Sequence, residues 1–153
     1  MASLVIDVNG SAHIGVWGSS IPVPGEQVAS VRQNLPPLVT NGQISPDIAN
    51  LDNWGYTLNG VAAPPRSSLG EDSAGDILYA ASSSALPIDL AMALVDEGST
   101  NAMELDINPE SVQLDLAATP GSPLVAAVPG QNRPANQYLV GWTRDFIAVL
   151  ESG

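Results

Sequence analysis

The chain has 153 residues, of which 44% are apolar and 13% charged, so it can bury the core of one globular domain and is not a disordered polyelectrolyte. Sixteen acidic residues against four basic ones give a net charge of −12, which repels nucleic acid phosphates and anionic membranes, and we expect no nucleic acid partner. The absence of cysteine excludes disulfides, thiolate nucleophiles and sulfur-bound metal. The longest apolar runs are too short for membrane insertion.

The N-terminal part is rich in strand-forming residues. Residues 2–8 and 11–17 flank Asn9-Gly10, the dipeptide that best fits a type I′ turn, and this pattern predicts a hairpin. Met1 leads directly into the first strand, without the basic and apolar regions of a signal peptide. The sequence itself therefore leaves the location in the cell open.

A short helix is predicted over residues 26–35, because Val28, Val31 and Leu35 recur at helical spacing before Pro36-Pro37 ends the pattern. Residues 41–58 are rich in Asn, Asp, Pro and Gly around Trp54, and we expect an ordered loop there.

A second hairpin and the strongest helix signal follow. Residues 72–75 supply turn residues after Arg66 to Gly70 and before a strand over residues 76–81. A helix is predicted over residues 87–97, because Pro87 suits a first turn and Gly98 suits a helix end.

The rest of the chain predicts short strands over residues 102–107, 112–116 and 124–128, a turn at residues 119–122, and one or two strands over residues 138–150. Hairpins outnumber helical crossovers in this order of elements. The expected fold class is therefore α+β, a mainly antiparallel sheet with two short helices packed on it, in a single domain over residues 1–153.

The segment Arg66-Ser67-Ser68 suits a phosphodiester, because a guanidinium flanked by hydroxyls offers parallel charge-assisted hydrogen bonds to two oxygens. We predict these three residues as substrate contacts. The alternative is a surface arginine that pairs with Glu71 or Asp72.

Glu104 and Asp106 lie two residues apart, so on a strand they face the same side, while the apolar residues beside them face the core. Two neighbouring carboxylates can act as acid and base, or bind a divalent cation through oxygen. We predict both as catalytic residues and as candidate metal ligands, with Asn108 as a substrate contact. The alternative is a solvated strand face.

The remaining candidate side chains carry weaker signals. His13, the single histidine, has no nucleophile motif beside it, and we predict a structural role. Trp54 lies in a polar loop and is the candidate surface for stacking of a sugar ring, whereas Trp17 and Trp142 are expected as core or loop anchors. No nucleotide-binding glycine motif occurs, so no nucleotide cofactor is implied. A divalent cation is the one cofactor that the paired carboxylates suggest.

Four segments of the chain match the motifs of a known family, in the same order along the sequence. They are residues 28–35 with Thr40 to Gln43, Trp54-Gly55, Arg66 to Gly70, and Ala102 to Glu110 after the Pro87 helix. Together they resemble the C-terminal half of a phosphodiester glycosidase domain of the actinobacterial type. In that family a short helix precedes a glycine-containing loop, and an acidic motif, matched by Leu105-Asp106, ends a strand.

The departures from that family concern the site itself. Better-known members have Leu-Asp-Gly-Gly-Gly-Ser where this chain has Leu105 to Pro109, and their N-terminal Asn-Gly-Gly-Phe-Phe element is missing. The resemblance therefore implies an incomplete domain whose site needs an N-terminal segment or a second chain.

The resemblance also implies an activity, the hydrolysis of a sugar-1-phosphodiester linkage in a carbohydrate phosphodiester substrate. It further implies a secreted or cell-envelope parent protein. The alternative is a non-catalytic structural or glycan-binding subunit that retains the fold.

Overall fold

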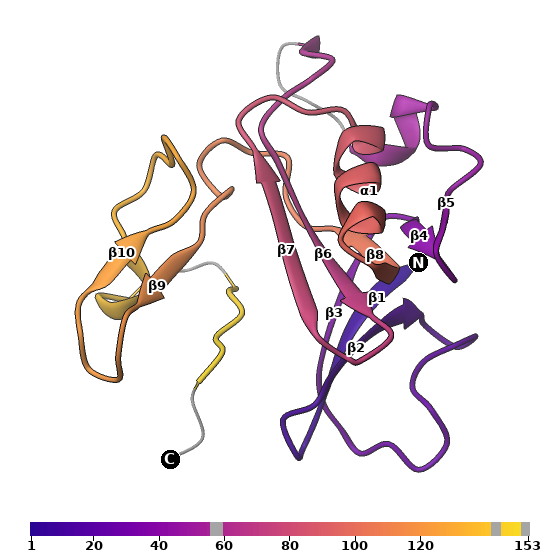
Figure 1. Cartoon of the computed structure of the whole chain (residues 1–153), viewed down its shortest axis with the longest axis horizontal. Helices are drawn as coiled ribbons and strands as arrows, with labels where there is room; N and C mark the ends of the chain where they lie inside the picture. The colour runs from indigo at the N-terminus through magenta and orange to yellow at the C-terminus, as the bar shows by residue number, and fades with distance from the viewer. Residues whose placement is uncertain (56–59, 142–144, 151–153) are drawn as a thin grey trace.

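The computed structural model describes residues 1–55, 60–141 and 145–150, which form three antiparallel sheets, one α-helix and two short 3₁₀ helices (Figure 1). The largest sheet has the order β5 (Gln43–Ile44), β4 (Pro37–Thr40), β8 (Ser99–Glu104), β6 (Arg66–Asp72) and β7 (Ile77–Ser82). The second has the order β2 (Ala12–Val16), β1 (Ala2–Asp7) and β3 (Val28–Asn34), and the third pairs β9 (Asp115–Ala117) with β10 (Leu124–Ala126). The α-helix is α1 (Pro87–Asp96), and the 3₁₀ helices are η1 (Leu51–Trp54) and η3 (Gln137–Leu139). The sheet-dominated α+β class is confirmed.

The five-stranded sheet is the middle layer of the molecule. Helix α1 covers one face, and its buried Ala91 and Leu94 pack in a cluster with Leu38, Trp54 and Ala102 (Figure 1). On the other face, Leu69 and Met103 pack against the second sheet through Ala2, Leu4 and Ile14. The central strands β6 and β8 are therefore covered on both faces, whereas β9 and β10 stand to one side (Figure 1).

The first hairpin is confirmed, but its turn is of another type. The Gly10 N–H donates to the Asp7 carbonyl at 2.9 Å, and Gly10 has φ of 89°. This is a three-residue loop closed by a left-handed glycine. The conformation expected of a type I′ turn occurs instead at Asn41 (φ 51°) and Gly42 (φ 74°), which join β4 to β5 with Thr40 opposite Gln43.

The helix predicted over residues 26–35 is wrong, because residues 28–34 form strand β3. This strand pairs with β1 from Ala2 opposite Asn34 to Asp7 opposite Val28. The buried strand β1 has β2 on one side only, and the backbone N–H and C=O groups of its other edge require partners. The segment over residues 28–35, where the resemblance implied a short helix, is thus a strand in this chain. Of the two helices predicted, α1 is the single α-helix in the described residues.

Several other predicted elements hold with altered bounds. The hairpin after Arg66 is confirmed as β6–β7 and the helix over residues 87–97 as α1, while the strand predicted over residues 102–107 is β8, which begins and ends three residues earlier. The strands predicted over residues 138–150 are wrong where the structure describes them, since η3 and irregular backbone lie there, and residues 142–144 lie outside the described part. Among the described helices, none is long and apolar enough to cross a membrane.

Candidate functional site

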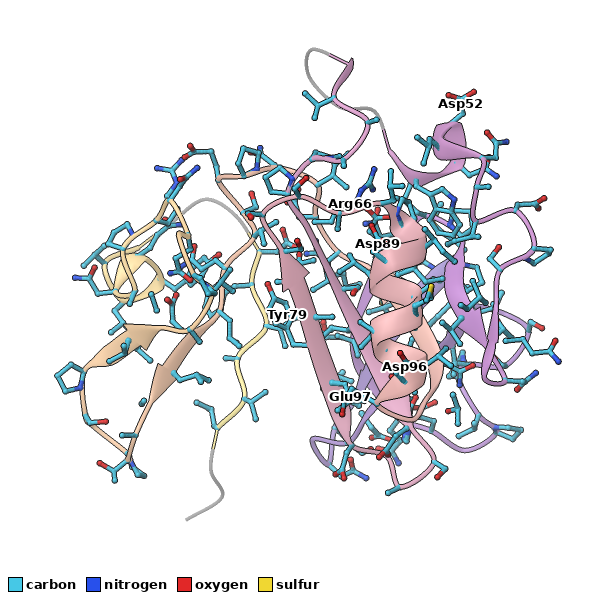
Figure 2. The ribbon with its side chains drawn as sticks, turned by 45° about the horizontal axis from the view of Figure 1, so that its top comes forward. Asp52, Arg66, Tyr79, Asp89, Asp96 and Glu97 are labelled. Atoms are coloured by element: carbon cyan, nitrogen blue, oxygen red, sulfur yellow. The ribbon has the colours of Figure 1, made fainter. Side chains whose placement is uncertain are left out.

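Arg66 and Glu104 form a buried ion pair between the neighbouring strands β6 and β8. The Arg66 Nη1 group donates to Glu104 Oε1, and the two side chains are 2% and 0% exposed. Arg66 also donates from Nη1 to the Trp54 carbonyl at 2.9 Å and from Nε to the Ala85 carbonyl at 3.0 Å. Figure 2 shows Arg66 beside the first turn of α1, where Asp89 is labelled. The guanidinium thus joins β6 and β8 to η1 and to the chain just before α1.

The pair lies on the sheet face that α1 covers. Ser68 is opposite Glu104 in the β6–β8 register, and Arg66 is two residues away along β6, so both charged side chains project to the same side. Both alternatives to a functional site are wrong for these two residues. Glu104 does not lie on a solvated strand face, and the partner of Arg66 is Glu104 rather than Glu71 or Asp72.

Burial raises the pKa of Glu104 to about 7. The charge and hydrogen bond of Arg66 oppose this rise, and the charge of Asp106 adds to it. The Oε2 atom of Glu104 is buried and has no hydrogen-bond partner. A carboxyl whose pKa is raised toward neutrality is suited to act as a general acid or base.

Asp106 follows the end of β8 in an irregular stretch. The Ser67 N–H donates to the Asp106 carbonyl at 2.9 Å, and the Leu105 N–H donates to the Ser67 carbonyl at 2.8 Å, so two residues of one chain segment face one residue of β6. Such a bulge interrupts the alternation of a strand. Asp106 Oδ1 accepts from the Asn108 N–H at 2.9 Å, and Asn108 Oδ1 accepts from the Glu110 N–H at 3.0 Å. Both predicted site residues hold the turn in which they lie.

Two tyrosines near Asp106 were not singled out from the sequence. The Tyr79 hydroxyl donates to the Gln113 carbonyl at 3.2 Å, and burial raises its pKa, with Asp106 adding to the rise. Burial also raises the pKa of Tyr138. The negative charges of Asp115 and Asp106 add smaller increases, and the positive charge of Arg32 opposes them. Figure 2 shows Tyr79 on β7, on the side of the C-terminal strands. A lone tyrosine in a short strand has no local pattern that would mark it as part of a site.

The other predicted substrate contacts lie beneath the surface. Ser67 and Ser68 are 2% and 0% exposed, and the Ser68 hydroxyl donates to the Ala80 carbonyl at 3.4 Å. Trp54 is also fully buried, and its indole N–H points to the Asp47 carbonyl at 3.5 Å. Ser67 projects to the other face of the sheet from Arg66 and Ser68, the face that packs against the second sheet. Contact of these residues with a substrate stays a prediction.

No metal cluster marks the ion pair in the described part of the chain, and neither of two surface hollows is lined by it. Within residues 1–55, 60–141 and 145–150, no group of three or more His, Asp or Glu side chains could hold a metal ion, and the predicted metal role of Glu104 and Asp106 stays a prediction. Two surface hollows lie elsewhere, one over β1 and β3 and one beside β4 and β5. Neither is lined by Arg66, Glu104 or Asp106.

His13 lies apart from these residues. Its Nδ1 atom is 2.9 Å from Glu71 Oε1, while Glu71 Oε2 accepts from the Ile14 N–H at 2.6 Å. This contact links β2 to β6, in line with the structural role predicted for the histidine.

Comparison with solved structures shows a fold of the phosphodiester glycosidase kind. The chain is similar to the zebrafish N-acetylglucosamine-1-phosphodiester alpha-N-acetylglucosaminidase catalytic domain, auto-inhibited by its pro-peptide, with a TM-score of 0.51 and 17% sequence identity. The likeness covers 71% of this chain but 40% of that structure, so the chain spans well under half of the neighbour's length. No family model and no curated protein sequence matches the chain. At this identity the comparison shows the fold alone.

Proposed function

We propose that the chain forms part of a phosphodiester glycosidase of the actinobacterial type, which hydrolyses a sugar-1-phosphodiester linkage. The fold of the structural neighbour and the ordered sequence segments support this proposal. The neighbour is named for N-acetylglucosamine-1-phosphodiester, and this is the substrate class to test first.

The observation that carries the proposal is the state of Glu104. It is a buried carboxyl with a pKa near 7, one oxygen on Arg66 and the other without a partner. A general acid for hydrolysis must hold a proton near neutral pH and pass it to the leaving oxygen. Asp106, half-buried two residues later, is then the second carboxylate, which accepts a proton from the attacking water.

Arg66 has two roles in this proposal. It holds the Glu104 carboxylate, and it binds the phosphate together with Ser67, Ser68 and Asn108, with the ring of Trp54 against the sugar. Phosphate binding requires the carbonyls of Trp54 and Ala85 to release the guanidinium. We therefore propose that an N-terminal segment or a second chain completes the site. Alternatively, Glu104 and Asp106 could bind a divalent cation through their carboxylate oxygens.

The test is release of free N-acetylglucosamine and aryl phosphate from an aryl ester of N-acetylglucosamine 1-phosphate, by the chain alone and with the completing segment, with and without divalent metal. Glu104→Gln and Asp106→Asn should each lower the rate by at least about 100-fold. Asp96→Asn, an exposed carboxyl at the end of α1, should leave the rate unchanged. A wild-type chain that stays inert with the completing segment supplied contradicts the proposal.

The non-catalytic alternative is favoured by one observation: Arg66 and Glu104 pair with each other in the core, and neither side chain lines either of the two hollows. As a structural or glycan-binding subunit, the chain should associate with a partner through exposed apolar side chains. Leu139, Val140, Val149 and Leu150 are at least 70% exposed. Light scattering that shows a stable, soluble monomer counts against this alternative.

A further inference from the structure

The hollow over the second sheet contains an arginine within reach of solvent. Leu4 and Ile6 of β1, residues 30–34 of β3 and the C-terminal residues Asp145 to Ile147 line this groove, whose volume is about 390 Å³. The groove thus combines apolar side chains, the Arg32 guanidinium and a segment from the far end of the chain.

Arg32 is held in an exchangeable contact. Its Nη1 group donates to Asp145 Oδ2, and the two side chains are 29% and 73% exposed. The Nε atom of Arg32 is buried and has no hydrogen-bond partner. An exposed ion pair contributes little to stability, so an anion from solvent can replace the Asp145 carboxylate at the Nη1 end of the guanidinium.

Arg32 differs from the other arginines that the structure describes. Arg66 is enclosed in the core by Glu104 and two carbonyls. Arg133 lies outside both hollows and pairs with Glu110 at 2.6 Å. Among the described arginines, Arg32 is therefore the one that both reaches solvent and lines one of these two hollows.

The surroundings of Arg32 fit a phosphate attached to a sugar. The Phe146 ring, which stacks on Tyr138 with centroids 4.6 Å apart, is 55% exposed and suits the apolar face of a pyranose. The Asn34 amide, also in the groove, donates to the carbonyls of Glu104 and Leu105 at 3.1 and 2.5 Å. The groove therefore adjoins the end of β8, where Asp106 follows.

We propose that this groove binds a sugar phosphate, with its phosphate on Arg32 and its sugar against Phe146, and that Asp145 occupies the guanidinium until the ligand displaces it. The sugar part of the ligand rests on the proposed function. The site itself rests on the geometry of Arg32 and Asp145.

Isothermal titration of the whole chain with N-acetylglucosamine 1-phosphate tests this site. Asp145→Asn frees the guanidinium and should tighten binding by about fivefold, while Arg32→Gln should weaken it by at least about tenfold. Arg32→Lys keeps the charge but loses the fork, and its affinity should lie between those of the wild type and Arg32→Gln. Arg133→Gln is the matched control and should bind as the wild type does.

Three outcomes overturn the site: no binding to either the wild type or Asp145→Asn, binding that is independent of Arg32, or equal affinity for N-acetylglucosamine without phosphate. If Arg32→Gln fails to fold, the test rests on the other two variants: Asp145→Asn should tighten binding and Arg32→Lys should weaken it. Binding in the expected pattern without hydrolysis contradicts the proposed activity and supports this site. Hydrolysis together with sugar phosphate binding that is independent of Arg32 contradicts this site and leaves the activity standing.

Discussion

The Arg66–Glu104 pair lies where charges are costly to bury, and its surroundings determine its effect on stability. The guanidinium donates to Glu104 and to the carbonyls of Trp54 and Ala85, while one Glu104 oxygen has no partner. Removal of Glu104 leaves a buried cation without its counter-ion, which costs far more than loss of a solvated pair.

Glu104→Ala should therefore lower the free energy of unfolding by about 3–5 kcal/mol. Glu104→Gln keeps an acceptor for Arg66 and should cost less. The control is Glu110→Ala, which removes the 47% exposed partner of Arg133 and should cost less than about 1 kcal/mol. Urea denaturation measures all three variants, and equal losses for the two alanine variants contradict the argument.

The raised pKa of Glu104 also predicts a pH dependence. Burial raises this pKa from 4.5 to about 7, so the folded chain binds the proton more tightly than the unfolded chain does. The contribution of Glu104 to stability is fully present below about pH 4.5 and is lost as the pH rises through about 7. The stability of Glu104→Gln relative to wild type should rise over this range and then level off. Urea denaturation at pH values from 4 to 8 checks this, and a constant difference is the contrary result.

The sequence singled out Glu104 and Asp106, but strand alternation alone placed both on one open face. The bulge opposite Ser67 interrupts the alternation before Asp106, and α1 with Trp54 covers the face on which Glu104 lies. Both effects depend on which distant segments pack around β8. They leave no signal in residues 102–110 themselves.

At the scale of elements, α1 approaches the sheet closely because β6 has a glycine beneath it. A Cβ added at Gly70 would lie 2.1 Å from Ser99 Oγ, 2.9 Å from Ser99 Cβ and 3.1 Å from Leu94 Cδ2. A side chain at position 70 would therefore collide with Ser99 of β8 and press on Leu94 of α1.

Gly70→Ala should lower the free energy of unfolding by about 1–3 kcal/mol, because it overpacks this contact. The Ser99 hydroxyl is buried without a hydrogen-bond partner, so Ser99→Ala alone should be close to neutral. In the double variant the serine oxygen no longer meets the new methyl group, and part of the loss should be recovered. Denaturation of the four chains of this cycle measures the coupling, and strictly additive effects contradict it.

Elements with local signals were predictable, and elements defined by partners were not. Pro87 and Gly98 mark the ends of α1, and turn residues mark the β1–β2 and β6–β7 hairpins. Strand β3 carries valines three residues apart, which fits a helix as well as a strand, and the free edge of β1 determines its state. Local pattern alone could not separate the two.

At the scale of the whole molecule, Glu71 joins the two larger sheets. It belongs to β6, and its carboxylate accepts from the backbone N–H of Ile14 on β2, the edge strand of the second sheet. Its other oxygen is 2.9 Å from His13 Nδ1, and its own carbonyl accepts from the Thr100 hydroxyl at 3.0 Å. The Glu71 side chain, on an interior strand of the five-stranded sheet, thus accepts a hydrogen bond from a backbone N–H on the edge strand of the second sheet.

Glu71→Ala leaves the Ile14 N–H without its acceptor and should lower the free energy of unfolding by about 1–3 kcal/mol. The Ile14 amide should also exchange with solvent markedly faster, since this edge of β2 loses its tie to β6. Glu71→Gln retains an oxygen acceptor and should preserve most of the protection. His13→Ala, which removes a side chain that is 38% exposed, should leave the Ile14 amide protected. Hydrogen exchange followed by NMR separates these cases, and an Ile14 amide that exchanges equally slowly in Glu71→Ala would show that the sheets are held together by their apolar contacts alone.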